Sequence, residues 1–148
     1  MKSISSKKLK GNILIPGDKS ISHRLVILSS IAIGRSNIKG LLKSDDIMKT
    51  IGAMQNFGAS IEFKNSFNCS IKGVGLGGLL EPKSALDFGN SGTAARLIMG
   101  LSASHSITTL YVGDSSLSIR PMDRVLKPLI NFGSNYSLRK DNYLPAIL

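Results

Sequence analysis

The strongest constraint on this chain is an internal repeat. Residues 24–27 (Arg-Leu-Val-Ile) return as residues 96–99 (Arg-Leu-Ile-Met), and the tripeptide Asn-Phe-Gly at 56–58 returns at 131–133. In both halves the expected elements come in the same order of helix, strand, helix, strand, turn and strand. Matched residues and matched apolar periodicity over about 55 residues are typical of a structural repeat. The sequence therefore predicts two α/β units that pack on a common core.

Apolar spacing and capping residues set the expected elements. The first helix is expected over 22–33, with Ser20 or Ser22 as its N-cap and Gly34 as its stop. Further helices are expected over 45–57, over 91–104 and from Pro121 onward, and strands over 37–42, 60–63, 67–74 and 107–112.

Composition excludes several classes of protein. A length of 148 residues with 42% hydrophobic and 19% charged residues is typical of one compact domain rather than a disordered chain. The apolar run over 25–33 is interrupted by two serines and is too short to span a membrane, and the run over 13–15 is too short for a signal-peptide core. We therefore expect a cytoplasmic protein that neither enters nor contacts a membrane.

Cysteine and histidine usage indicates no structural metal. Cys69 is the one cysteine, and neither it nor His23 or His105 lies at metal-ligand spacing. Phe67, Cys69 and Ile71 alternate in an expected strand, which places Cys69 in the core. His105 follows the third helix and is expected at the surface.

The net charge of +10 indicates an anionic partner. Composition alone leaves open a nucleic-acid surface or a pocket for anionic small molecules. Nucleic-acid binders usually interleave basic stripes with aromatic residues, whereas this chain has no tryptophan and no basic cluster beyond its first ten residues. We therefore expect small-molecule anions and no nucleic acid.

The loop that opens the first helix has the composition of an anion site. Residues 16–24 read Pro-Gly-Asp-Lys-Ser-Ile-Ser-His-Arg, so an ammonium, two hydroxyls and a guanidinium lie beside the free N–H groups of a helix N-terminus. The alternative is a capped helix with solvated charges. Asp18 is expected to be a loop or capping carboxylate rather than a base.

Two further loops have a similar composition. Residues 88–94 (Phe-Gly-Asn-Ser-Gly-Thr-Ala) open the corresponding helix of the second unit, and residues 113–120 end in Arg120. Since the first two loops occupy equivalent places in the repeat, their helix ends are expected on one face. The run Gly-Val-Gly-Leu-Gly-Gly at 73–78 satisfies the dinucleotide pattern, but Glu81-Pro82 follows where a helix should open, so we interpret it as a link between units.

Taken together, residues 16–24, 86–94 and 113–122 resemble the 5-enolpyruvylshikimate-3-phosphate synthase family, and the resemblance runs from Gly11 to Leu148. It implies transfer of the enolpyruvyl group of phosphoenolpyruvate to the 5-hydroxyl of shikimate 3-phosphate by addition and elimination of phosphate, on the route to chorismate and the aromatic amino acids. No cofactor or metal is implied.

The resemblance also implies roles for individual residues. Lys19 is expected to contact both substrates and to stabilise developing charge. The residues expected to bind shikimate 3-phosphate are Lys19, Ser20 and Arg24, and those expected to bind phosphoenolpyruvate are Lys19, Asn90, Gly92, Thr93 and Arg120.

The implied fold is α/β, with repeated βαβαββ units in an inside-out α/β barrel, of which this chain supplies two of the three units of one domain. Residues 1–17 are expected to contain a strand at about 10–15 that packs with the other domain, and residues 18–148 to form a partial domain with units at about 18–78 and 79–148. The portion not present, with further catalytic groups, is expected to be needed in trans. The alternatives are a catalytically incomplete fragment that only binds anions, and a relative of UDP-N-acetylglucosamine enolpyruvyl transferase.

Two positions depart from the family pattern. Ile119 stands where relatives commonly have a polar residue, and Asp123 stands where the motif usually has glycine. A carboxylate at 123 is expected to weaken anion binding by Arg120. Gly92 is the small residue of glyphosate-sensitive relatives, so an assembled active form is expected to be inhibited competitively by glyphosate.

Overall fold

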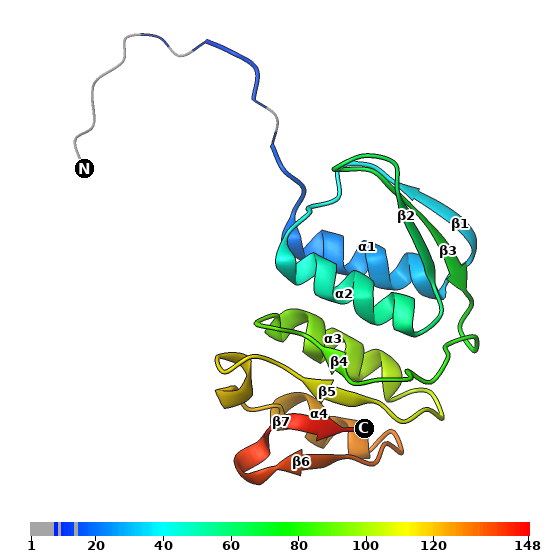
Figure 1. Ribbon diagram of the computed structural model, residues 1–148, viewed down its shortest axis with the longest axis vertical. Coiled ribbons are helices and arrows are strands. Elements are labelled where there is room, and N and C mark those ends of the chain that lie inside the picture. Colours follow the sequence, from blue (N-terminus) through cyan, green and yellow to red (C-terminus); the bar gives the residue numbers. More distant parts are fainter. Residues whose placement is uncertain (1–7, 9, 14) are drawn as a thin grey trace.

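The computed structural model describes residues 8, 10–13 and 15–148 of the chain (Figure 1). The expected first strand at 10–15 lies partly outside the described residues. Ile13 and Ile15, which are described, belong to no strand and are largely exposed. The division into an N-terminal strand that packs with the other domain and a partial domain at 18–148 stays a prediction.

The first unit is a helix pair covered by an antiparallel sheet. Its elements are α1 (Lys19–Ile31), β1 (Ile33–Ile38), α2 (Asp45–Asn56), β2 (Ser60–Phe63) and β3 (Cys69–Val74). The strand order is β1-β3-β2, and both pairings are antiparallel.

The second unit repeats this arrangement with one more strand at the sheet edge. Its elements are β4 (Leu86–Asp87), α3 (Gly92–Ser102), β5 (Leu110–Val112), the 3-10 turn η1 (Leu117–Ile119), α4 (Asp123–Ile130), β6 (Ser137–Arg139), the 3-10 turn η2 (Lys140–Asn142) and β7 (Tyr143–Ile147). The order is β4-β5-β7-β6, with β4 parallel to β5 and the other pairs antiparallel. Since β5, β7 and β6 follow the order of β1, β3 and β2, the predicted repeat is confirmed.

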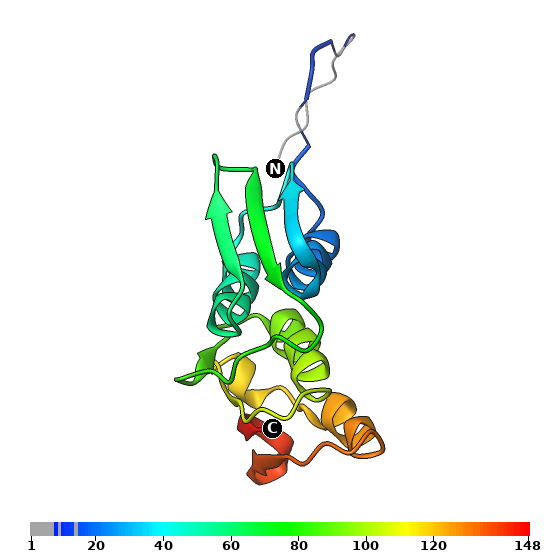
Figure 2. The ribbon, with the colours of Figure 1, turned by 90° about the vertical axis from the view of Figure 1, so that its right-hand side faces the viewer.

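The helices lie beside one another through the molecule, with contacts between α1 and α2, between α2 and α3, and between α3 and α4 (Figure 1). Viewed from the side, the sheet of the first unit covers one flank of α1 and α2 (Figure 2). The contact between α2 and α3 joins the two units.

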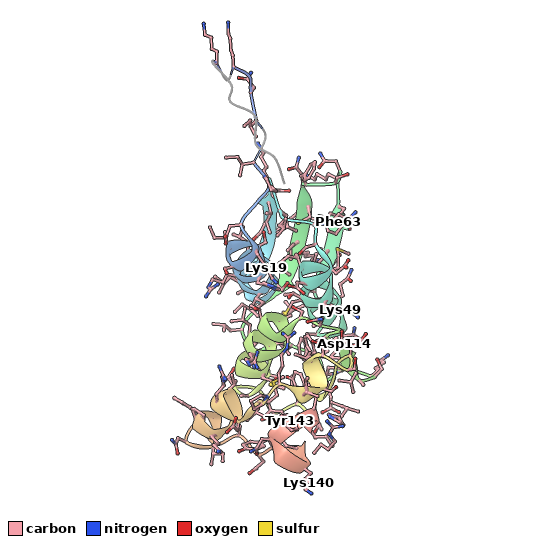
Figure 3. The ribbon with its side chains drawn as sticks, turned by 90° about the vertical axis from the view of Figure 1, so that its left-hand side faces the viewer. Lys19, Lys49, Phe63, Asp114, Lys140 and Tyr143 are labelled. Carbon is pink, nitrogen blue, oxygen red and sulfur yellow. The ribbon has the colours of Figure 1, made fainter. Side chains whose placement is uncertain are left out.

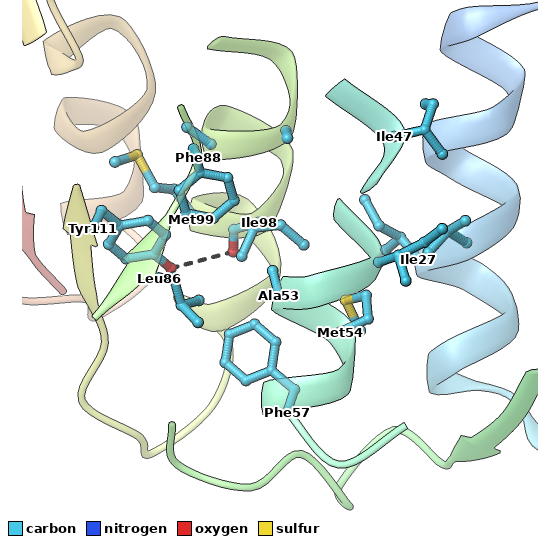
Figure 4. Packing of buried hydrophobic residues seen from close by; sticks show 14 of the residues in the cluster. Ile27, Ile47, Ala53, Met54, Phe57, Leu86, Phe88, Ile98, Met99 and Tyr111 are labelled. Atoms are coloured by element: carbon cyan, nitrogen blue, oxygen red, sulfur yellow. Dashed lines mark hydrogen bonds between the residues drawn. The ribbon is translucent and has the colours of Figure 1, made fainter. Parts of the chain in front are cut away.

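One apolar core runs across that joint (Figure 4). Ala53 and Phe57 of the first unit meet Leu86 and Ile98 of the second, and all four side chains are buried. Tyr111 stacks on Phe88 with ring centroids 5.6 Å apart. Burial of apolar area across the joint therefore sets how the units sit together.

Helix α1 begins and ends earlier than predicted. The prediction of 22–33 with a serine cap was wrong, because Asp18 is the N-cap and its carboxylate accepts the Ile21 amide (2.7 Å). Gly34 lies inside β1 instead of stopping the helix, so the strand expected at 37–42 is found at 33–38.

Two smaller predictions were also wrong. Phe67 lies outside β3 and is 59% exposed, so it does not share the buried face of Cys69 and Ile71. Pro121 precedes α4, which begins at Asp123. The core position of Cys69 is confirmed, and burial raises the pKa of its thiol.

The run at 73–78 behaves as expected for a link. Gly73 and Val74 end β3, and no helix follows before β4. Among the described residues, no helix has the length and apolar character needed to cross a bilayer.

Replacing Phe57 with alanine tests the joint. The side chain is fully buried, so Phe57→Ala is expected to lower the free energy of unfolding by about 3–5 kcal/mol in urea denaturation. Phe67→Ala is the matched control, because that ring is exposed, and it is expected to change stability by less than about 1 kcal/mol. Equal losses in both variants would contradict this description of the core.

Candidate anion site at the helix N-termini

Helices α1, α2 and α3 all begin on the left-hand side of the molecule in Figure 1, where the loop over 113–120 also lies. We call this side the N-terminal end of the helices. Figure 3 views this end and shows Lys19, Lys49 and Asp114 along it. Helix N-termini present unpaired N–H groups and the positive ends of helix dipoles. The expectation that the first two loops share one face is confirmed. Helix N-termini gathered in this way are suited to binding anions.

The first loop places Lys19 and Arg24 at the start of α1. Asp18 caps the helix, as a capping carboxylate was predicted to do. Lys19 forms an ion pair with Asp46 from the first turn of α2, and its side chain is half-exposed. Arg24 donates to the Ser20 carbonyl (3.0 Å), so its guanidinium lies over the first helical turn.

Two buried side chains fix this loop against its surroundings. The Leu42 amide donates to Ser22 Oγ (3.1 Å). His23 Nδ1 lies 2.7 Å from Thr50 Oγ1 on α2, which ties α1 to α2 beside the Lys19–Asp46 pair. Burial, and then the charges of Lys19 and Arg24, lower the pKa of His23, so the ring is neutral near pH 7.

The second and third loops meet at Arg120. Its guanidinium donates to Asn90 Oδ1 (2.8 Å) and Ser116 Oγ (3.0 Å). A Cβ atom on Gly92 would lie 3.4 Å from Arg120 Nη1, so the start of α3 lies beside the same guanidinium. Ser91 caps α3 by accepting the Ala94 amide (3.3 Å).

Arg96 is a functional candidate that sequence reasoning missed. It donates to the Gly92 carbonyl and to the Pro121 carbonyl, both at 3.2 Å, and so connects the start of α3 to the segment after Arg120. Burial, and then the charges of Arg124 and Arg120, lower its pKa. The signal was available, because Arg96 repeats Arg24 and makes the same contact to the carbonyl four residues earlier.

The two residues that depart from the family pattern have other surroundings than the Arg120 guanidinium. Ile119 is 70% exposed. Asp123 pairs with Lys127 (3.0 Å), whose hydrogen bond lowers the pKa of the Asp123 carboxyl. The expected weakening of anion binding by the Asp123 carboxylate stays a prediction.

The predicted site residues fall into two groups at the N-terminal end of the helices. Asn90, Gly92 and Arg120 are brought together, while Lys19 pairs with Asp46 on the neighbouring helix. Ser20 and Thr93 are exposed in the first turns of α1 and α3. Their substrate roles stay predictions. Within the described part of the chain, no three acidic, histidine or cysteine side chains gather as a metal site would require.

The fold defines a repeated α/β protein with parallel helix N-termini and cationic side chains gathered at one end of the helices. Residues 4–148 match the family model of EPSP synthase (3-phosphoshikimate 1-carboxyvinyltransferase), and the chain belongs to this family. The predicted family and the predicted α/β fold class are thereby confirmed.

Individual relatives agree with this assignment. The chain is 54% identical over 133 residues to 3-phosphoshikimate 1-carboxyvinyltransferase of Sphingopyxis alaskensis, covering 90% of this chain and 30% of the relative. It is 49% identical over 140 residues to the Novosphingobium aromaticivorans protein of the same name, covering 95% and 32%. The solved EPSP synthase from Acinetobacter baumannii superposes with a TM-score of 0.89 at 38% identity, covering 93% of this chain and 32% of that one.

The chain thus spans about a third of the length of the relatives it matches. Their names do not favour the alternative of a UDP-N-acetylglucosamine enolpyruvyl transferase relative.

The buried His23 generates a prediction on pH. Because its pKa is lower in the folded chain than in the unfolded chain, the unfolded chain binds more protons below the ordinary value of 6.5, and stability falls as the pH drops through this range. Urea denaturation near neutral pH and at about pH 5.5 is expected to show a smaller loss for His23→Asn than for the unchanged chain. An identical loss in both would contradict a buried neutral ring.

Proposed function

We propose that this chain forms part of the active site of a 3-phosphoshikimate 1-carboxyvinyltransferase, which transfers the enolpyruvyl group of phosphoenolpyruvate to the 5-hydroxyl of shikimate 3-phosphate and releases phosphate. The observation that carries the proposal is the contact of Arg120 with Asn90 beside Gly92, at an end shared with Lys19. Family membership supports it.

The geometry suits two substrates that both carry phosphate and carboxylate groups. Arg120 offers a planar guanidinium beside the N-terminus of α3, which favours bidentate binding of a carboxylate or phosphate of phosphoenolpyruvate. Lys19 and Arg24 lie at the start of α1 and are proposed to bind shikimate 3-phosphate, with Ser20 donating from the same turn. Asn90 and Thr93 complete the wall at α3.

The proposed chemistry is electrostatic and positional. Two polyanions bound at neighbouring helix N-termini are aligned for attack, and Lys19 stabilises charge that develops between them. Residues equivalent to the two thirds of the relatives that this chain does not match are proposed to supply the remaining groups, in trans if they belong to another polypeptide. A cytoplasmic location is part of the proposal.

Calorimetric titration of the 148-residue chain tests the proposal. Shikimate 3-phosphate, with and without phosphoenolpyruvate, is expected to bind saturably, and Lys19→Ala and Arg120→Gln are each expected to weaken binding at least about tenfold, as loss of a charged contact does. Lys72→Ala is the matched control, because Lys72 is exposed on β3.

Several outcomes would contradict the proposal. They are absence of binding by a folded chain, or binding that Lys19→Ala leaves unchanged. Displacement of both substrates by inorganic phosphate at equal concentration would favour the alternative of a fragment that only binds anions. Steep salt dependence with preference for nucleic acid would favour a nucleic-acid surface.

Replacing Gly92 with alanine tests the phosphoenolpyruvate side alone. The added methyl group would lie 2.8 Å from Arg96 Nη1, so the Arg96 guanidinium must shift, and 3.4 Å from Arg120 Nη1, in contact with the second guanidinium. We expect weaker binding of phosphoenolpyruvate and little change for shikimate 3-phosphate in the same titration. Gly100→Ala is the control, because a methyl group there meets nothing within 4 Å. Equal effects of the two variants would contradict the assignment of Gly92.

A further inference from the structure

An ion pair between the two units connects helix α2 to the loop that opens α3. Lys49 Nζ lies 2.5 Å from Asp87 Oδ2, and Asp87 Oδ1 accepts the Gly89 amide (2.8 Å). The two oxygens of one carboxylate therefore bind the first unit and the α3 entry loop, residues 88–91. From the contacts of both oxygens we propose that Lys49 and Asp87 are positioning residues, which set where Asn90 and Gly92 stand relative to Lys19.

The lysine stem also packs on the loop itself. Gly89 has a φ of +51°, and a Cβ atom there would lie 3.0 Å from Lys49 Cε. Only glycine combines this backbone conformation with so close an approach. Lys49 therefore contacts the entry loop through its methylene groups as well as through Asp87.

The opposite side of the entry loop is bound within the second unit. The Asp114 amide donates to the Gly89 carbonyl (2.9 Å), and the Phe88 amide donates to the Val112 carbonyl (2.9 Å). These contacts connect the loop to the segment that leads to Arg120. On its other side, the entry loop is connected to α2 by the ion pair between Lys49 and Asp87.

Helix α2 binds both halves of the site through one face. Asp46 pairs with Lys19, and Lys49, three residues later, pairs with Asp87. Side chains three residues apart lie on the same face of a helix. Figure 3 shows Lys19 and Lys49 along the end that carries the site. A shift of Lys49 thus changes the separation of the two anion-binding loops without removing any group that contacts an anion.

The Lys49–Asp87 ion pair is exposed, so its main effect is expected on the position of the entry loop rather than on the stability of the fold. The Lys49 side chain is 36% exposed and that of Asp87 is 57% exposed. Exposed ion pairs contribute little to the free energy of unfolding. The hydrogen bond from Lys49, and then the Gly89 amide, lower the pKa of Asp87, so the carboxylate is charged at neutral pH. Removing the pair is therefore expected to move the loop while leaving the chain folded.

Amide resonances of the ¹⁵N-labelled chain test the inference. Lys49→Met and Asp87→Asn are expected to shift the amide signals of Gly89, Asn90 and Gly92, with nearly unchanged urea midpoints, and Lys49→Arg is expected to restore them because a guanidinium keeps the charge. Glu62→Gln is the matched control for Asp87→Asn, since Glu62 pairs with Arg35 across β1 and β2 (3.6 Å) and contacts neither loop. If Asn90 and Gly92 signals in Lys49→Met and Asp87→Asn shift no more than in Glu62→Gln, the inference is wrong.

A titration distinguishes failure of this inference from failure of the proposed function. The inference rests on the proposed function only for the identity of the ligand. With phosphoenolpyruvate as the probe, Lys49→Met is expected to weaken binding several-fold while shikimate 3-phosphate binding changes less. Absence of any response of the unchanged chain to either compound contradicts the proposed function, whereas dependence of the Asn90 and Gly92 signals on Lys49 still supports positioning. Equal phosphoenolpyruvate affinity in Lys49→Met and the unchanged chain contradicts positioning of the site.

Discussion

The apolar contact between α2 and α3 is the constraint on which the other features depend. Ala53 and Phe57 pack against Leu86 and Ile98, so the second helix of one unit is fixed beside the first helix of the next. Because the helices run in the same direction, this packing brings their N-termini to one end (Figure 1). The candidate site therefore depends on how two copies of one unit stack, because its proposed residues come from three different loops.

The cationic side chains gathered at the N-terminal end of the helices repel one another. Hydrogen bonds and ion pairs with nearby groups offset this repulsion. Arg24 and Arg96 each donate to a carbonyl in the first turn of their own helix, while Lys19 and Lys49 each pair with a carboxylate. The carboxylates come from another helix or the other unit, so charge neutralisation also aligns the elements. If an anion binds there, as we propose, it replaces part of this internal compensation, so that side chains that do not contact the anion also influence its binding.

Much of this arrangement can be predicted from the sequence, because it depends on local signals. The repeat, α2, β2 and the core position of Cys69 follow from periodicity and spacing. The start of α1 was misplaced because two serines compete with Asp18 as cap, and only the contact with the Ile21 amide decides between them. The pairs Lys19–Asp46 and Lys49–Asp87 join distant segments, so their spacing carries no signal.

Mapping where an anion binds to the chain tests the proposed site most directly. We would titrate the ¹⁵N-labelled chain with phosphoenolpyruvate and monitor the amide chemical shifts, which report on the backbone N–H groups along the chain in one experiment. We predict that the largest shifts cluster at the starts of α1 and α3, around Ser20 and Gly92, and beside Arg120. Shifts concentrated instead in the pocket near His105 and Phe132, at the opposite ends of the helices, would contradict it.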